Sequence, residues 1–184
     1  MPALDLRQVR TVFLDRDGTI NVKAAAGEYV TSPAELTLLP GAAKAVAALN
    51  AARLRTVLVT NQRWLSFPSA DPGRYAAVHA RLEQLLAREG ARLDAAYHCP
   101  HETSVCDCRK PGAGMLLRAA REHRFELTEA VTIGDSDTDL IAGRSAGTAT
   151  VLLRPGRRVA AGADAVVKDL DAAVRLVLKW QPWC

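Results

Sequence analysis

Two aspartates, Asp15 and Asp17, stand one residue apart directly after the apolar run that begins at Val12. Such a run is typical of a buried strand, and at its carboxyl end both carboxylates can turn toward one point. Gly18 then allows the turn. Ligands of open α/β sheets bind beyond the carboxyl ends of strands, where this pair would lie. An aspartate-rich turn after a core strand explains this segment alone equally well.

Further polar side chains follow the later apolar runs. In chain order they are Thr60 and Asn61, then Lys110, and then Asp135 with Asp139. Phosphoryl transfer places negative charge on the transferring oxygens, so its site needs a nucleophile, a proton source, cations and neutral donors. Together these residues supply each of those groups and indicate phosphoryl transfer. The alternative for Lys110 is a surface lysine before a proline.

The carboxylates indicate a magnesium site. Three carboxylates that converge repel one another unless a hard dication lies among them, and Mg²⁺ takes carboxylate, carbonyl and water oxygens. We expect its protein ligands to be Asp15, Asp135 and the backbone carbonyl of Asp17. Asp139, one helical turn beyond Asp135, either orients Lys110 or a metal-bound water or is only an acid favoured at a helix N-terminus. Both roles can hold together.

A second cluster lies in the ten residues from Cys99 to Cys108, which also contain His101 and Cys106. Three thiolates and one imidazole are the ligand set of a closed tetrahedral Zn²⁺ site. Because no coordination position stays open, the ion is expected to be structural and to staple the loop that delivers the following basic residues. Three reduced cysteines in a cytosolic loop are the alternative. Cys184 stands alone at the carboxyl end.

Strands and helices alternate along the chain. Strand-like runs lie at 9–14, 56–59, 93–97, 130–133, 149–153 and 164–167, and helical patterns lie at 41–53, 75–90, 114–123 and 170–180. This alternation predicts an α/β fold with a doubly wound parallel sheet. Segments 16–39 and 63–73 show neither period and are expected to be loops near the site. Asp137 is predicted to cap a helix. The length favours one domain, 1–184.

Composition excludes several classes of protein. The chain is 49% hydrophobic and 24% charged, with no stretch that resembles a signal peptide or a membrane span, so a cytoplasmic protein is expected. The net charge is +4, but the basic residues are spread among helices, which argues against a nucleic-acid partner. The positive balance suits a small anionic substrate, and solvated helix faces explain it as well. We expect a monomer.

The ordered strand-end motifs resemble the haloacid dehalogenase (HAD) superfamily of phosphatases over nearly the whole chain. The resemblance implies a Rossmann-like sheet without a large cap domain and a reaction through an aspartyl-phosphate. In these enzymes the position of Asp15 belongs to the nucleophile and that of Asp17 to the general acid and base. Lys110 would hold the phosphoryl oxygens, with hydrogen bonds from Thr60 and the backbone of Asn61.

Two segments narrow this resemblance. Cys-Pro-His followed by Cys-Asp-Cys-Arg-Lys-Pro, with Asp-Arg-Asp-Gly-Thr-Ile-Asn near the front, resembles the phosphatases of D-glycero-D-manno-heptose 1,7-bisphosphate and of histidinol phosphate. Gly-Glu-Tyr-Val at 27–30 favours the heptose branch, which removes the 7-phosphate. The substrate contacts that the resemblance implies come from strand ends and loops, namely Asn21, Gly27, Glu28, Tyr29, Asn61, Gln62, Arg109 and Ser136.

Three features depart from the heptose pattern. The heptose enzymes usually have a small residue, a glycine and a short basic stretch where this chain has segment 63–68. The spacing from His101 to Cys106 is shorter than in many of them and nearer to that of the histidinol phosphate phosphatases. Ser136 stands where a basic residue often contacts substrate. Histidinol phosphate therefore remains the alternative substrate. A catalytically silent, zinc-stabilised binding protein is the alternative of another class, although the complete set of reactive residues argues against it.

Overall fold

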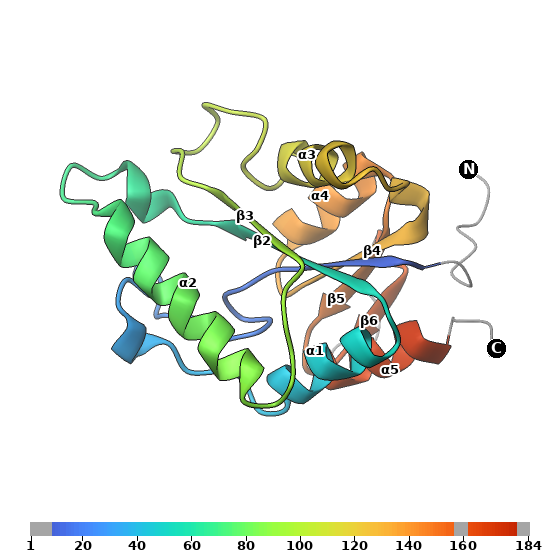
Figure 1. Cartoon of the computed structure of the whole chain (residues 1–184). Helices are drawn as coiled ribbons and strands as arrows, with labels where there is room; N and C mark the ends of the chain where they lie inside the picture. Colours follow the sequence, from blue (N-terminus) through green and yellow to red (C-terminus); the bar gives the residue numbers. More distant parts are fainter. Residues whose placement is uncertain (1–8, 157–161, 180–184) are drawn as a thin grey trace.

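The computed structural model describes residues 9–156 and 162–179. Six strands form one parallel sheet in the order β3-β2-β1-β4-β5-β6 (Figure 1). The strands are β1 (Thr11–Leu14), β2 (Arg55–Asn61), β3 (Ala95–Cys99), β4 (Ala130–Gly134), β5 (Ala149–Leu153) and β6 (Ala165–Val167). The helices are α1 (Ala42–Ala51), α2 (Pro72–Ala87), α3 (Gly114–His123), α4 (Asp137–Ala146) and α5 (Leu170–Lys179).

Helices cover both faces of the sheet, which gives three layers (Figure 1). Val12 and Leu14 of β1 pack into one hydrophobic core with α1, α2 and α5. Phe13, between them in sequence, packs into a second core with α3 and α4. Alternate side chains of a strand point to opposite faces, so a strand buried on both faces reads as a continuous apolar run. The predicted doubly wound parallel sheet is confirmed.

Several predicted bounds differ from the structure. β1 begins at Thr11 instead of residue 9, and β3 spans Ala95–Cys99 instead of 93–97. Helix α2 begins earlier than predicted, at Pro72, because the Asp71 side chain accepts a hydrogen bond from the Gly73 backbone and caps it. α5 is described to Lys179, so the predicted end at residue 180 lies outside the described residues, as does Cys184.

Helix α4 corrects the prediction for Asp137. The N-cap is Ser136, whose backbone N and Oγ both donate to Asp139 Oδ2, at 3.1 and 2.5 Å. Asp137 is instead the first helical residue and accepts a hydrogen bond of 2.9 Å from Arg154 Nη2. A serine followed three residues later by an acid forms a capping box. This pair places the N-cap at Ser136 and not at Asp137.

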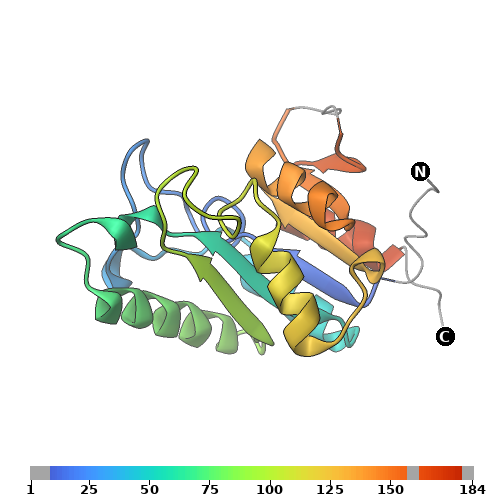
Figure 2. The ribbon, with the colours of Figure 1, turned by 90° about the horizontal axis from the view of Figure 1, so that it is seen from above.

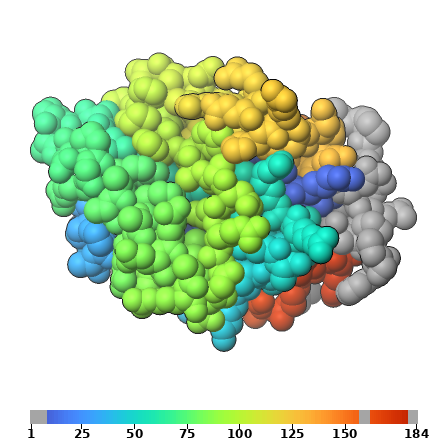
Figure 3. Space-filling view, in the orientation of Figure 1, coloured from blue at the N-terminus to red at the C-terminus, as the bar shows by residue number. Residues whose placement is uncertain are grey.

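Three loop segments lie beyond the carboxyl ends of β1, β2 and β3, and Figure 2 shows them side by side. The first, 15–41, contains the short 3-10 helix Pro33–Glu35. Its later part runs antiparallel to its beginning where Leu38 pairs with Asn21. The second, predicted as a loop, contains the 3-10 helix η3 (Arg63–Ser66). The third is the cysteine segment 100–108. In Figure 3 the second and third segments form one continuous surface.

Within the described residues, no helix has both the length and the apolar character needed to cross a membrane. The same residues form no large insertion that would be a cap domain, because the three loop segments carry only 3-10 helices. The site is therefore bordered by the loops beyond β1, β2 and β3.

Candidate active site

A buried lysine connects the ends of three strands. Lys110 Nζ lies 2.6 Å from Asp15 Oδ1, beyond β1, and 2.5 Å from Asp139 Oδ1, in α4. It also donates to the carbonyl oxygen of Val59 in β2, at 2.8 Å. Lys110 is 4% exposed, Asp15 7% and Asp139 2%. A buried charge is stable only when it is paired and hydrogen-bonded, and each donor of this ammonium has an acceptor.

The charges of this cluster change the pKa values of its members. Burial alone would lower the pKa of Lys110, but the carboxylates of Asp15 and Asp139 more than offset it and raise the pKa. Burial raises the pKa of Asp15 to about 7, against the lowering effect of Lys110 and with a further increase from Asp139. Lys110 therefore stays charged, and the pKa of Asp15 lies near neutral pH.

The carboxylate oxygens of Asp15, Asp135 and Asp139 approach within 4.8 Å of one another. Oδ1 of Asp135 is buried without a hydrogen-bond partner, whereas Oδ2 accepts one of 2.8 Å from Lys23 Nζ. An unpartnered buried carboxylate oxygen beside a second carboxylate is the donor set that a hard dication takes. The residues therefore fit Mg²⁺. Sequence reasoning missed Lys23, because it lies in a loop without any periodic pattern.

Glycine is required where the backbone approaches these carboxylates. A Cβ at Gly18 would lie 2.3 Å from Asp135 Oδ2, and the residue has a φ of +88°. A Cβ at Gly134 would lie 2.4 Å from Cβ of Asp139. Any side chain at either position would push a carboxylate out of the cluster.

Asp17 is held by donors from three directions. Its Oδ1 accepts from Asn21 Nδ2 at 3.0 Å, and its Oδ2 accepts from Gln62 Nε2 at 3.0 Å. The guanidinium of Arg16 reaches both oxygens. The Asp17 side chain is 23% exposed, and it lies outside the group of three converging carboxylates. This agrees with the expectation that only its backbone carbonyl would be a metal ligand, which stays a prediction.

The side chain of Asn61 is hydrogen-bonded to the backbone of Lys110. Its Nδ2 donates to the Lys110 carbonyl oxygen at 2.9 Å, and its Oδ1 accepts from the Lys110 backbone N at 3.1 Å. Both ends of the amide are thus used to fix the backbone of Lys110. Thr60 Oγ1 accepts from Gln62 Nε2 at 2.8 Å. The side chains of Asn61 and Gln62 are thus engaged within the protein, and substrate contact by the Asn61 backbone stays a prediction.

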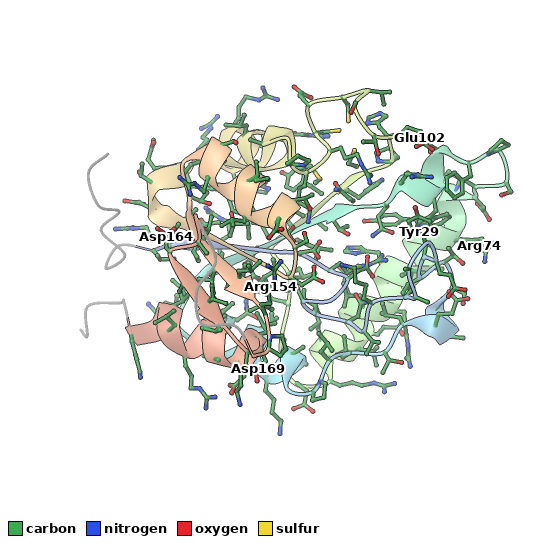
Figure 4. The ribbon with its side chains drawn as sticks, turned by 180° about the vertical axis from the view of Figure 1, so that it is seen from behind. Tyr29, Arg74, Glu102, Arg154, Asp164 and Asp169 are labelled. Carbon is green, nitrogen blue, oxygen red and sulfur yellow. The ribbon has the colours of Figure 1, made fainter. Side chains whose placement is uncertain are left out.

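The other predicted substrate residues lie on the loops. Gly27 and Glu28 are exposed, and Tyr29 packs edge-on against Phe67 with ring centroids 5.8 Å apart. Arg109 Nη1 donates to the carbonyl oxygen of His101 at 3.3 Å. Ser136 differs, because its hydroxyl is taken up by the cap of α4. Figure 4 shows Tyr29 on the same side of the molecule as Glu102 of the cysteine segment.

Cys99, His101, Cys106 and Cys108 converge as the sequence predicted. The three Sγ–Sγ distances are 3.6, 3.3 and 3.2 Å, and His101 Nδ1 lies 3.6 Å from Cys99 Sγ and 3.2 Å from Cys108 Sγ. Four ligands about 2.3 Å from one Zn²⁺ stand about 3.8 Å apart, so a small expansion of this cluster accommodates the ion. The residues fit structural zinc.

The geometry defines a class of protein: a doubly wound sheet that presents converging carboxylates and a buried lysine at its strand ends is that of a HAD-like hydrolase. A HAD-hydrolase-like family model matches residues 107–173. A D-glycero-β-D-manno-heptose-1,7-bisphosphate 7-phosphatase from Bordetella bronchiseptica is 38% identical over 149 residues, 80% of this chain and 82% of its own. A D-glycero-D-manno-heptose-1,7-bisphosphate 7-phosphatase from Thermosynechococcus vestitus is 36% identical over 90% of this chain and 94% of its own.

Solved structures agree with these relatives. The D,D-heptose 1,7-bisphosphate phosphatase of B. bronchiseptica, complexed with magnesium and phosphate, superposes with a TM-score of 0.84 at 34% identity. The match covers 93% of this chain and 99% of that one. The chain belongs to the family of D-glycero-β-D-manno-heptose-1,7-bisphosphate 7-phosphatases, and it is a phosphatase of the HAD superfamily. The relatives favour an enzyme over a catalytically silent binding protein.

Proposed function

We propose that this protein hydrolyses the 7-phosphate of D-glycero-D-manno-heptose 1,7-bisphosphate through an aspartyl-phosphate on Asp15. The observation that carries the proposal is the buried cluster in which Lys110 joins Asp15 and Asp139 beside the unpartnered oxygen of Asp135. Names of relatives at 32–38% identity supply the substrate. Mg²⁺ held by Asp15, Asp135 and the carbonyl of Asp17 would neutralise charge on the phosphoryl oxygens.

The proposed first step forms a bond between a carboxylate oxygen of Asp15 and phosphorus while the bond from phosphorus to the sugar oxygen breaks. Lys110 Nζ, which donates to Oδ1 of Asp15, would keep the carboxylate oriented for this attack. Asp17 gives its proton to the departing alkoxide. Lys110, together with Thr60 and the backbone of Asn61, would hold the phosphoryl oxygens.

In the proposed second step, water attacks the phosphorus of the aspartyl-phosphate. Asp17, now a carboxylate, takes a proton from this water as the new bond to phosphorus forms. The bond from phosphorus to Asp15 breaks, and inorganic phosphate leaves with both the nucleophile and the acid restored.

Substrate selection is proposed to lie in the loops. Without a large cap, hydroxyl groups of the sugar must be recognised by polar groups around the strand ends, and a site that is built to pair with hydroxyls rejects analogues that lack them. Arg109 offers a planar fork for the second phosphate of a bisphosphate. Histidinol phosphate has no second phosphate, so Arg109 would not add to its binding.

The test compares kcat/KM for heptose 1,7-bisphosphate and histidinol phosphate, with the released phosphate assigned to its carbon. We expect the bisphosphate to be preferred, the 7-phosphate to leave first, and Arg109→Ala to lose most of the preference. Arg121→Ala, which removes an arginine from the exposed surface of α3, is the matched control. Faster turnover of histidinol phosphate, or earlier release of the 1-phosphate, would refute the substrate while leaving the mechanism intact.

We further propose that the protein acts in the cytoplasm as a monomer on a small phosphorylated substrate, without a nucleic-acid or membrane partner. The spread of basic residues along the chain supports this proposal. Light scattering after size exclusion would give the mass in solution, which we expect to equal that of one 19.8 kDa chain.

A further inference from the structure

A fully hydrogen-bonded glutamine lies behind Asp17. Gln62 is 1% exposed, and its Nε2 donates to Asp17 Oδ2 at 3.0 Å and to Thr60 Oγ1 at 2.8 Å. Its Oε1 accepts from Trp64 Nε1 at 2.9 Å and from Arg16 Nη2 at 3.2 Å. Two donors and two acceptor positions are all that a side-chain amide has, so Gln62 has no capacity left for a ligand.

The neighbours of Gln62 decide which way its amide faces. The indole of Trp64 and the guanidinium of Arg16 are donors only, so they must face the amide oxygen. The amide nitrogen is then directed at Asp17. If the amide rotated by half a turn, its oxygen would face the carboxylate and both donor-only groups would face an NH₂ group. The Trp64 N–H therefore determines that Asp17 receives a hydrogen bond from this side.

The helix η3, which carries Trp64, is fixed by contacts to two other loops. Arg63 Nε lies 3.1 Å from Glu102 Oε2, and Ser66 Oγ donates to Glu102 Oε1 at 3.0 Å. On the other side Phe67, directly after the helix, packs against Tyr29. Tyr29 and Glu102 lie on the same side of the molecule in Figure 4. The indole is 4% exposed, so neither its position nor its direction is free to vary.

We propose that Trp64 and Gln62 are positioning residues for Asp17. Trp64 fixes the orientation of the Gln62 amide, and Gln62 holds the Asp17 carboxyl where it can exchange a proton with the leaving oxygen. This assigns a role to segment 63–68, for which the family resemblance offers none. The proposal rests on the proposed function, because it takes Asp17 as the general acid.

A positioning role predicts an effect that depends on the leaving group. A sugar alkoxide must be protonated as it departs, whereas the phenolate of an activated aryl phosphate leaves without a proton. The value of kcat/KM reports the steps up to formation of the aspartyl-phosphate, in which this difference appears. A loss of general acid function therefore lowers kcat/KM for the sugar phosphate and leaves that for p-nitrophenyl phosphate nearly unchanged.

The experiment uses two variants of the full-length, Mg²⁺-loaded protein. Trp64→Phe keeps the buried ring and removes only the N–H, and we expect kcat/KM for heptose 1,7-bisphosphate to fall about fivefold, the worth of one neutral hydrogen bond. Gln62→Glu keeps the shape and the acceptor oxygen that faces Trp64 and Arg16, but it removes the donor to Asp17 and to Thr60. It should cost about 10²-fold on the sugar phosphate, the lower end of what a positioned acid contributes. Trp64→Phe should retain the aryl phosphatase activity, and Gln62→Glu should lose far less of it than of the activity on the sugar phosphate.

Tyr97→Phe is the matched control, because it likewise removes one aromatic donor, here in β3, where Tyr97 Oη donates to Glu122 at 2.6 Å. It should leave the ratio of the two kcat/KM values unchanged. An equal loss on both substrates in Trp64→Phe and Gln62→Glu, or no loss on either, would overturn the positioning role. A wild-type protein without Mg²⁺-dependent activity on any phosphate ester would instead overturn the proposed function, and this role with it.

Discussion

The carboxylate and lysine cluster takes its members from positions 15 to 139 of the chain, whereas the cysteine and histidine cluster takes all of its members from positions 99 to 108. The first exists because parallel strands end at one edge of the sheet, and the second exists because ligands lie close together in sequence. The first depends on the whole fold and the second on a single loop. Lys110, two residues beyond Cys108, connects them.

The two clusters also differ in how their charge is balanced. Lys110 neutralises part of the negative charge of Asp15 and Asp139 in the absence of any metal. The second cluster consists of three thiols and one imidazole that contact one another, and it has no lysine among its members to offset the charge of the thiolates. The first cluster should therefore stay assembled without Mg²⁺, whereas the second should lose its geometry without Zn²⁺.

The largest expected effect is that of Asp15→Asn. The amide lacks the charge and nucleophilicity of the carboxylate, so turnover and phosphoenzyme formation should both disappear while the protein stays folded. Asp137→Asn, at an exposed aspartate close to the site, is the control and should keep its activity. Phosphate release by Asp15→Asn near the wild-type rate would show that another residue is the nucleophile.

Asp17→Asn should have the next largest effect. It removes the proposed proton donor but leaves the nucleophile, so kcat should fall by about 10² to 10⁴. Steady-state release of phosphate from the sugar phosphate measures this loss. Unchanged kcat would remove Asp17 from the mechanism.

Loss of the second cluster should mainly affect stability. The purified protein is expected to contain about one zinc ion per chain, and Cys106→Ser should lower the free energy of unfolding by several kcal/mol. Val105→Ser places the same side chain at the adjacent, 66% exposed position and should change little. Metal analysis and thermal unfolding measure both effects. Protein purified without chelator that contains no zinc would contradict the account of this cluster.

The smallest expected effect is the pH dependence of Mg²⁺ binding. Burial raises the pKa of Asp15 to about 7, so below this pH a proton competes with the metal for the same carboxylate. Mg²⁺ affinity should therefore fall as the pH falls, toward a limit of about tenfold per pH unit. Titration calorimetry between about pH 8 and about pH 6 measures it. An affinity that stays constant over this range would show that Asp15 is already ionised.

The sequence predicts the two clusters with unequal completeness. The four candidate zinc ligands converge as predicted, because their spacing in one loop is the signal. Asp15 and Asp135 were found from the rule that strand ends meet. The direction of side chains was not predictable, since it depends on tertiary contacts. The Asn61 side chain is hydrogen-bonded to the backbone of Lys110, and nothing in its sequence context shows this.

The sequence also predicts the positions of the strands with unequal accuracy. β1, β4 and β5 are buried on both faces, and their apolar runs gave their positions to within two residues. β3 lies at the edge of the sheet with alternating burial, so its register follows from pairing with β2, and the predicted range was two residues early. Helix η3 arises from contacts of Glu102 and Tyr29 and was missed for the same reason.

The central claim is that Asp15 becomes phosphorylated during turnover at the carboxylate and lysine cluster. The most direct test is an acid quench of wild-type protein during turnover of heptose 1,7-bisphosphate with Mg²⁺, followed by mass spectrometry of the peptides. We predict one phosphoryl group on Asp15 that is labile to hydroxylamine, as an acyl-phosphate is, and none in Asp15→Asn. A phosphoryl group on another residue, or steady turnover in which the Asp15 peptide never carries one, would contradict the account.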